Sequence, residues 1–394
     1  MARQDGLYQW TQVVTKELPH LSKPQATVLA LWSFGLVLAH ACGTTRVAAV
    51  LAKRTGCKAD TLRQRLREWY WDAAAKRGQQ RQSLAVELCF GPLLAWIIRC
   101  WPANEHRLAL ALDATALGNR FTVLVISLLY RGCAIPVAWH VLPAGQAGSW
   151  QPHWARLLQA LAGAVPRDWL VLVLADRGLY SRRLYRVVQR LHWHPFFRIN
   201  AKGTYRRVRT KDWQPLRSLP GGVGTRWAQH VICFQHKPLG CTLLAYQAEG
   251  YDERWLVVTD LPLAQAQIGW YGLRFWIECG FKHLKSKGWQ WQHTRMTDAQ
   301  RVARHWLALA LATLWCLSVG GEGDAHIPLS TLEALPPTHI ARRTKGRRQR
   351  RRVLSCFQQG LIAITEALLL KRRLPAMRFT PEPWPDLPPP LVQR

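Results

Sequence analysis

The feature that most constrains the fold is the order of apolar segments between residues 106 and 200. Three successive segments read as strands, joined by short turns at Gly118–Asn119 and Arg131–Gly132, which predicts an antiparallel meander. A helical pattern over Ser149–Val165 follows them. The last segments are a continuously apolar strand, a helix and a fifth strand, at Asp168–Gly178, Ser181–Leu191 and His194–Asn200.

Three meandering strands, a helix, a strand, a helix and a strand is the ribonuclease-H order, an α/β fold with a mixed sheet flanked by helices. Short strands, proline–glycine turns and many basic residues after residue 200 predict a β-rich insertion that interrupts this plan. We therefore expect five regions: a helical N-terminal region at 1–105, the first part of the ribonuclease-H-like domain at 106–200, the insertion at 201–262, a helical completion of the domain at 263–320 and a basic C-terminal region at 321–394.

The helical completion contains two predicted helices. The first spans about residues 265–287. The second spans about 298–318, with Thr297 and Gln300 at the spacing of a capping box and Gly320–Gly321 at its end.

The charge of the chain is strongly positive. Its 54 Lys and Arg against 23 Asp and Glu give a formal net charge of +31. Such an excess disfavours the compact state unless a polyanion is bound, and duplex DNA is the obvious polyanion. The densest run, residues 342–352, is expected to hold phosphates without reading sequence, and the proline-rich last fifteen residues are expected to be extended.

Other protein classes are disfavoured by the sequence. The start, MARQDGLYQW, lacks the apolar core of a signal peptide, and the apolar runs near 27–42 and 305–319 are interrupted before they could cross a bilayer. The ten cysteines are scattered without a C-x-x-C pair, which favours a reducing cytoplasm over a disulfide framework or a zinc finger.

A pair of short helices is predicted near the N-terminus. Val47–Arg54 and Asp60–Trp71 flank a break at Gly56. Arg63 and Arg67 lie on the second helix, so the pair is either a helix-turn-helix that binds DNA or a plain helical hairpin with a solvated arginine face.

Two aspartates follow apolar strand sequences, Asp113 in LALALDAT and Asp176 in VLVLADRG. Either one alone is explained by capping a turn or, for Asp176, by pairing with Arg177. In the ribonuclease-H order, however, their strands are neighbours, so the two carboxylates meet across one strand spacing. Two like charges at that distance call for a divalent cation between them.

A third acid stands on the first predicted helix. At about 100° per residue, Tyr271, Arg274, Glu278, Lys282 and Lys285 share an arc of about 80°, while apolar residues occupy the opposite side. The alternative is a solvated helix face held by weak i,i+4 ion pairs.

The spacing Tyr271-x2-Arg274-x3-Glu278-x6-Lys285 resembles the signature of the DDE transposases of the insertion sequence 4 family. The context agrees, because ALDAT and LADRG precede a β-rich insertion that precedes the glutamate helix. The resemblance extends over about residues 106–318 and is strongest over 254–316, which is also similar to the hairpin-forming members of the group.

The resemblance implies roles for particular residues. Two Mg²⁺ ions, with Mn²⁺ as a substitute, would be bound by the triad Asp113, Asp176 and Glu278. Phosphates near the cleaved bond would be held by Tyr271, Arg274, Lys282 and Lys285. Trp255 matches an aromatic residue that stacks on a flipped base, although a place in the core is an equal alternative because it precedes an apolar strand.

A transposase of this kind would cut the ends of its insertion sequence and join them to target DNA, through a hairpin intermediate. We expect double-stranded DNA as the partner, a homodimer in a synaptic complex, no membrane association, and a location in the bacterial cytoplasm at the nucleoid. Two alternatives stay open: a ribonuclease-H-like nuclease or junction resolvase, and an inactive DNA-binding derivative. A tyrosine recombinase with Tyr271 as nucleophile is disfavoured because no cluster of Arg and His accompanies it.

Overall fold

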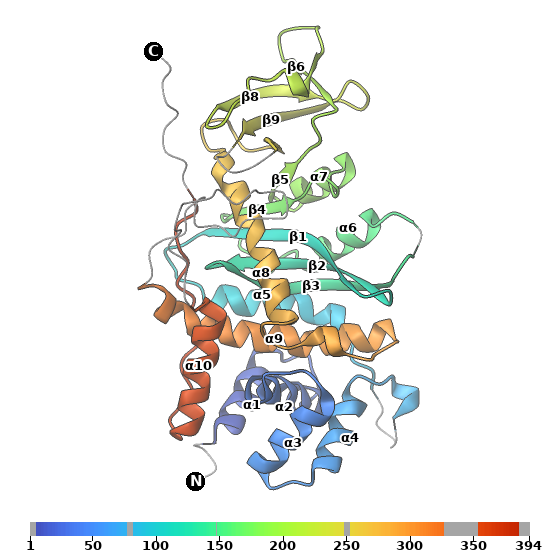
Figure 1. Cartoon of the computed structure of the whole chain (residues 1–394), viewed down its shortest axis with the longest axis vertical. Helices are drawn as coiled ribbons and strands as arrows, with labels where there is room; N and C mark the ends of the chain where they lie inside the picture. The colour runs from blue at the N-terminus through green and yellow to red at the C-terminus, as the bar shows by residue number, and fades with distance from the viewer. Residues whose placement is uncertain (1–4, 77–81, 147, 248–252, 327–353, 386–394) are drawn as a thin grey trace.

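The computed structural model describes residues 5–76, 82–146, 148–247, 253–326 and 354–385. Within these residues a sheet of ten strands is flanked by helices, with further helices of the N-terminal region beneath it (Figure 1). This is the mixed α/β fold with a helical N-terminal region that the sequence predicts. The basic run at 342–352 lies outside the described residues.

The strands form one continuous sheet in the order β3-β2-β1-β4-β5-β10-β9-β8-β6-β7. Their bounds are β1 Arg107–Leu117, β2 Phe121–Tyr130, β3 Cys133–Pro143, β4 Leu170–Ala175, β5 His194–Arg198, β6 Thr204–Arg207, β7 Gln214–Pro215, β8 Arg226–Cys233, β9 Leu239–Tyr246 and β10 Trp255–Thr259. The first five strands have the predicted ribonuclease-H order, with β1 parallel to β4 and β4 parallel to β5.

Turn chemistry fixes the meander. Arg131 and Gly132 both have positive φ, 46° and 72°, as a two-residue hairpin turn between β2 and β3 requires. The β-rich insertion is not a separate layer. Its last strand, β10, pairs antiparallel with β5, so the insertion continues the sheet from five strands to ten.

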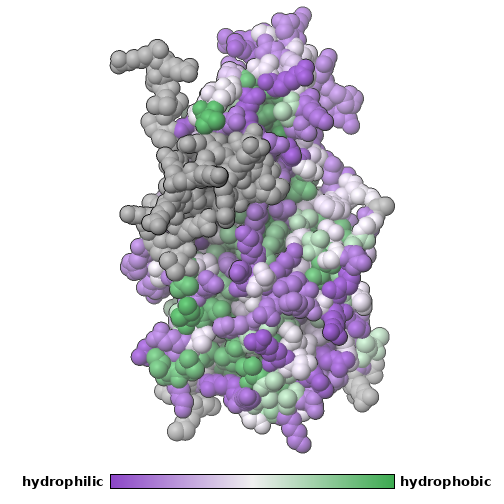
Figure 2. All heavy atoms as spheres, viewed as in Figure 1, coloured by the Kyte–Doolittle hydropathy of each residue, from purple (hydrophilic) through white to green (hydrophobic). Residues whose placement is uncertain are grey.

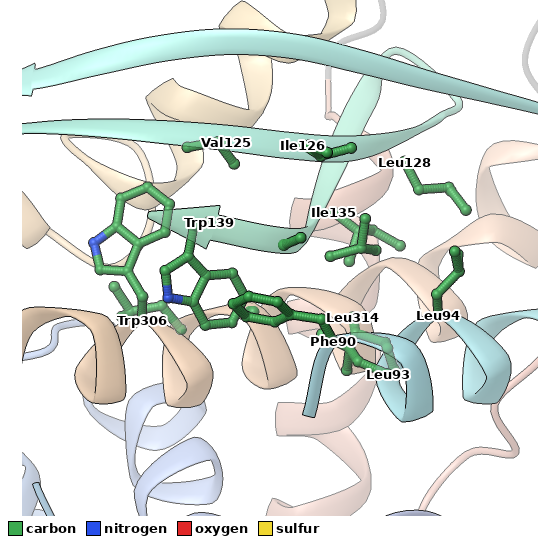
Figure 3. Close-up of a cluster of buried hydrophobic side chains, with 14 of the residues drawn as sticks. Phe90, Leu93, Leu94, Val125, Ile126, Leu128, Ile135, Trp139, Trp306 and Leu314 are labelled. Carbon is green, nitrogen blue, oxygen red and sulfur yellow. The ribbon is translucent and has the colours of Figure 1, made fainter. Parts of the chain in front are cut away.

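Successive side chains along each strand point to opposite sides of the sheet, and both faces of the sheet are apolar. On one face Leu110 and Val173 join the large core, which β2 and β3 line against helices α5 and α9 (Figure 3). On the other face Ala111 and Leu174 belong to a second cluster, under η5 and α8. The helices named are α5 Phe90–Arg99, α9 Ala299–Asp324, the 3-10 helix η5 Ile268–Phe275 and α8 Trp276–Leu284.

The remaining helices complete the layers. Ser181 starts α7 by accepting a hydrogen bond from the Leu184 amide, and Ser22 forms a capping box with Gln25 at the start of α2. Arg304 of α9 donates to the carbonyls of Tyr70 and Leu84, which ties the N-terminal region to α9. These helices are α1 Gly6–Glu17, α2 Lys23–Ala39, α3 Thr44–Thr55, α4 Ala59–Trp69, α6 Gln151–Ala160, α7 Arg182–Arg190 and α10 Cys356–Leu369.

The helix predicted over 265–287 is not a single α-helix. Residues 268–275 are a 3-10 helix, in which side chains three apart eclipse, so Tyr271 and Arg274 project in the same direction. Both are buried, with exposed fractions of 0% and 4%. The predicted arc of about 80° is therefore wrong for Tyr271 and Arg274, because α-helical periodicity does not apply to this segment.

The helix predicted over 298–318 is also longer and differently capped. Its N-cap is Asp298, whose side chain accepts from the Arg301 amide, and the helix continues to Asp324. Gly320 does not end it. A β-carbon on Gly320 would lie 1.9 Å from the Cys356 carbonyl oxygen, and one on Gly360 would lie 1.7 Å from that of Cys316. These glycines permit a close crossing of α9 and α10.

Among the described residues one helix, α9, is long and apolar enough to cross a membrane, and α2 with α3 would pass the same test only as a pair bent by 94°. However, 94% of the apolar window of α9 is buried inside the protein, where it serves as the central core helix. The face shown in Figure 2 is largely hydrophilic, with exposed hydrophobic side chains gathered at the lower left over α10.

Candidate active site

The structure brings Asp113 and Asp176 together at the carboxyl end of β4. Leu112 is the last β1 residue opposite β4, where it faces Ala175, so each aspartate is the next residue along its chain. Asp113 follows Ala111 by two positions and Asp176 follows Leu174 by two, which directs both side chains to the face under η5 and α8.

The sequence suggests that Asp113 ends its strand, but the structure places Asp113 within β1. β1 continues to Leu117 and keeps pairing with β2, with Asp113 opposite Val125. Only the pairing with β4 stops, because β4 ends at Ala175. Asp113 thus lies beside the open end of a shorter neighbour, which gives its carboxylate room.

A guanidinium lies between the two carboxylates. Arg274 Nη1 donates to Asp113 Oδ2 at 3.1 Å, and its Nη2 is 3.7 Å from Asp176 Oδ2. The Tyr271 hydroxyl donates to Asp176 Oδ1 at 3.3 Å. The eclipsed spacing of η5 therefore places a phenol and a guanidinium on the same pair of acids.

The environment shifts the pKa values of the two aspartates in opposite directions. Burial raises the pKa of Asp113, against the opposing effect of Arg274. Burial also acts to raise the pKa of Asp176, but Arg274, the Arg177 amide and Arg198 outweigh it, and the pKa is lowered. Although burial opposes its charge, Arg274 has a raised pKa because Tyr271, both aspartates and Glu278 favour the cation. The guanidinium remains charged, so the acid pair is held by a permanent cation.

The three other signature side chains lie along and beyond α8. Glu278 is half-buried in the first turn of α8, within the electrostatic reach of Arg274. Lys282 is exposed in the last turn. Lys285 lies just past the helix, where its Nζ donates to the Ala116 carbonyl at 3.0 Å and burial lowers its pKa.

The donor set fits a hard divalent cation. Asp113 and Asp176 supply carboxylate oxygens to one point, and such oxygens are the ligands that Mg²⁺ and Mn²⁺ prefer. Glu278 does not complete the set in this arrangement, since the described residues contain no group of three acidic, histidine or cysteine side chains that could hold a metal. Arg274 supplies positive charge where the acids converge.

Two residues of this site were missed in the sequence. Arg198, at the end of β5, is 5% exposed; it reaches Asp176 at 3.8 Å and Glu253 at 2.7 Å. Glu253 also pairs with Arg177 at 2.9 Å. The signal was present, because an arginine inside the apolar strand sequence HPFFRIN must find an anion when it is buried.

Trp255 lies in the core rather than on a surface. It begins β10 and is 1% exposed, with its ring 5.2 Å from that of Tyr271 and 5.9 Å from that of Phe275. This position agrees with the core alternative. Neither face of the ring is open to a base, because the second apolar cluster encloses it.

Arg63 and Arg67 lie on α4, which follows α3 after Gly56 in a left-handed conformation. Arg63 is exposed and pairs with Asp60 at 2.9 Å. The guanidinium of Arg67 lies 5.6 Å from the ring centre of Trp71. Two helices joined by a tight turn are present, and DNA binding by them stays a prediction.

The chain has recognisable similarity to one protein family. Residues 150–315 match the family described as the transposase DDE domain. The match is less than half of the chain; it includes Asp176 and Glu278 and begins after Asp113. No curated protein matches the sequence significantly.

Among solved structures, the chain is similar to a piggyBac transposase in a cryo-EM structure of its synaptic complex with hairpin DNA. The sequences are 12% identical, and the alignment covers 87% of this chain and 71% of the other, with a TM-score of 0.36. The likeness is a distant one.

Proposed function

We propose that this chain is a DDE transposase, an enzyme that cleaves DNA and transfers the cut strand with the help of divalent cations. The observation that carries the proposal is the meeting of Asp113 and Asp176 under η5, with Glu278 on the helix that follows. The match of residues 150–315 to the transposase DDE domain supports it.

Each residue has a proposed role. Asp113, Asp176 and Glu278 would hold Mg²⁺ or Mn²⁺, two ions in the complete site. The chemistry supplied by bound ions would be activation of the attacking oxygen and stabilisation of the leaving oxygen in an in-line displacement at phosphorus. Lys282 and Lys285 would hold the phosphates on either side of the cleaved bond, where charge-assisted hydrogen bonds are strongest.

Arg274 and Tyr271 would have a double role. In this structure they neutralise and orient the acid pair, which keeps two like charges together in a half-buried place. With DNA bound, the same donors would turn to phosphate oxygens, because the guanidinium fork fits phosphate as well as carboxylate. The acids would then be released to the cations.

The finer proposal concerns the substrate. The chain would act on the ends of its own insertion sequence as a homodimer, and would release the element through a hairpin before joining it to target DNA. The signature spacing of Tyr271, Arg274, Glu278 and Lys285 supports this reading.

The test uses duplex DNA that carries the sequences bordering the gene, incubated with Mg²⁺ or Mn²⁺. Asp113→Asn, Asp176→Asn and Glu278→Gln should each lower the nicking rate more than about a hundredfold, since even outer-shell changes at metal sites cost 10- to 100-fold. Asp168→Asn is the matched control, because Asp168 is an exposed acid just before β4. Wild-type cleavage by all three variants would overturn the assignment.

The products distinguish the alternatives. A transposase joins the freed 3′-OH to a second DNA, and a hairpin-forming one also gives covalently closed ends on a denaturing gel. Cleavage without any joined product would favour the nuclease or resolvase. Binding without cleavage by the wild-type chain would favour an inactive derivative.

A further inference from the structure

A cavity of about 570 Å³ lies between the helix pair α3–α4 and the segment that follows α8. The helix pair contributes Arg46 and Arg67 to its lining, and the other wall contributes Arg295 and Arg301. We call these four residues the arginine groove. The two walls are more than 200 residues apart in sequence, so the fold itself assembles this group of like charges.

The arginine groove carries an excess of positive charge. Within the described part of the chain, none of its four guanidinium groups makes an ion pair. The one acid in the lining, Asp298, uses its carboxylate to cap α9. Burial raises the pKa of Tyr70, and both Arg67 and Arg301 act against that effect, so the two walls direct positive charge at the same phenol.

Arg67 is also held in place. Its guanidinium lies 5.6 Å from the ring centre of Trp71, which lines the same cavity. The Tyr70 hydroxyl is 3.2 Å from Thr44 Oγ1, at the start of α3. Thr44, Tyr70 and Trp71 therefore line the same cavity as the arginines, and hydroxyl groups of Thr and Tyr together with arginines are among the groups that proteins use to contact phosphates.

Backbone hydrogen bonds and the Arg120 guanidinium fix the wall of the groove that follows Lys285. The Cys42 amide donates to the Trp289 carbonyl at 2.8 Å, and Arg120 donates to the carbonyls of Thr294 and Met296 at 2.6 and 2.8 Å. The Gln290 amide donates to the Lys285 carbonyl at 2.7 Å. The wall of the groove thus continues directly from the last signature residue.

We propose that the arginine groove binds the sugar–phosphate backbone of duplex DNA and guides the duplex away from the cleaved bond. This inference rests on the proposed function for the identity of the polyanion. The four guanidinium groups of the groove are planar forks, which can contact phosphates by paired hydrogen bonds. The groove reads no sequence, because contacts to phosphate position a duplex without identifying its bases.

The proposal separates two arginines of α4 that the sequence treats alike. Arg67 lies in the groove, whereas Arg63 pairs with Asp60 and does not line the cavity. A helix-turn-helix that inserts the exposed face of α4 into a major groove would depend on Arg63 at least as much as on Arg67.

The experiment measures binding of the full chain to a short fluorescein-labelled duplex of arbitrary sequence, by anisotropy over a range of salt concentrations. Arg67→Gln and Arg301→Gln should each lower the slope of log affinity against log salt by about one, and the double variant by about two. Arg63→Gln should leave the slope unchanged. Equal losses for Arg63→Gln and Arg67→Gln, or none for the groove variants, would overturn the proposal.

Amide hydrogen exchange on the wild-type chain provides a test independent of variants. DNA should slow exchange in residues 290–298 and in the first turn of α3, and protection confined to the exposed face of α4 would contradict the groove. The outcomes also separate the two proposals. Normal binding by the groove variants with loss of nicking in Asp113→Asn refutes the groove and leaves the proposed function standing.

Discussion

Among the residues of the candidate site, Arg274 is the one whose removal should destabilise the protein most. Its side chain is 5% exposed and contacts two aspartates whose side chains are 29% and 30% exposed. Its role is different from that of a surface ion pair, because burial acts to raise the pKa of both aspartates and Arg274 opposes that effect. The stability of this part of the protein therefore depends on a charge balance rather than on apolar packing alone.

Arg274→Gln should lower the free energy of unfolding by roughly 2 kcal/mol. Breaking a buried pair costs about 3–5 kcal/mol, and the partial exposure of the acids reduces this. Denaturant unfolding measures the effect. Asp113→Asn should be milder, and adding it to Arg274→Gln should recover part of the loss; equal midpoints for wild type and Arg274→Gln would contradict the charge balance.

For single residues, the sequence predicts which side chains come together better than it predicts how deeply they are buried. Asp113 and Asp176 are brought together because strand order and period two are local properties that the pattern displays. The burial of Arg274 and Tyr271 was not predictable in the same way, because it depends on a 3-10 helix under tertiary contacts. Arg198 and Glu253 meet across 55 residues, which no spacing rule covers.

Among the contacts between elements, the crossing of α9 and α10 brings backbone against backbone. Gly320 and Gly360 place backbone against backbone, so neither accepts a β-carbon without moving a helix. The sequence pattern Gly-Gly predicts a helix end, and here it marks a helix contact instead. The two meanings share one cause, the missing side chain, and only the position of α10 decides between them.

Gly320→Ala should destabilise the protein by about 3 kcal/mol, the upper range for overpacking, because the obstructing atom is a carbonyl oxygen of the partner helix. Gly323→Ala on the same helix is the control. Its β-carbon would meet only the end of the Gln359 side chain, and alanine favours helix by about 1 kcal/mol. Thermal unfolding of both variants decides the matter, since equal losses would refute the close crossing.

At the scale of the whole molecule, two buried histidines join separate layers. His305 of α9 lies edge-on to Trp32 of α2, with ring centres 5.1 Å apart. His283 of α8 stacks on Phe357 of α10 at 4.4 Å. Burial lowers the pKa of each to about 4. Both are neutral in the folded protein at physiological pH.

The free energy of unfolding should therefore fall as pH drops from about 6.5 to 4. In this interval the unfolded chain binds protons on both imidazoles and the folded protein does not, which disfavours folding by up to about 3 kcal/mol for each histidine. Asp113 titrates in the opposite sense, because its pKa is raised. Denaturant unfolding at several pH values gives the free energy of unfolding as a function of pH. This free energy should fall less steeply with decreasing pH in His305→Phe than in the wild type, and an unchanged dependence on pH would contradict this assignment.

The same scale shows what the sequence could not convey about the insertion. Its short strands and turns predict β structure after residue 200, since both signals are local. That β10 joins β5, and so makes one sheet of ten strands, depends on pairing across a span that includes the whole insertion. The sequences of these strands do not determine which edge of the sheet they pair with.

The alternation of side chains along β1 and β4 has a consequence for how the gene can change. Loss or gain of one codon ahead of Asp113 or Asp176 in its strand would turn that carboxylate to the opposite face, toward the large core. Packing tolerates such slips poorly, and a buried acid there makes them worse. One-residue insertions and deletions in these strands are therefore more harmful than two-residue ones, which keep each carboxylate on its own face.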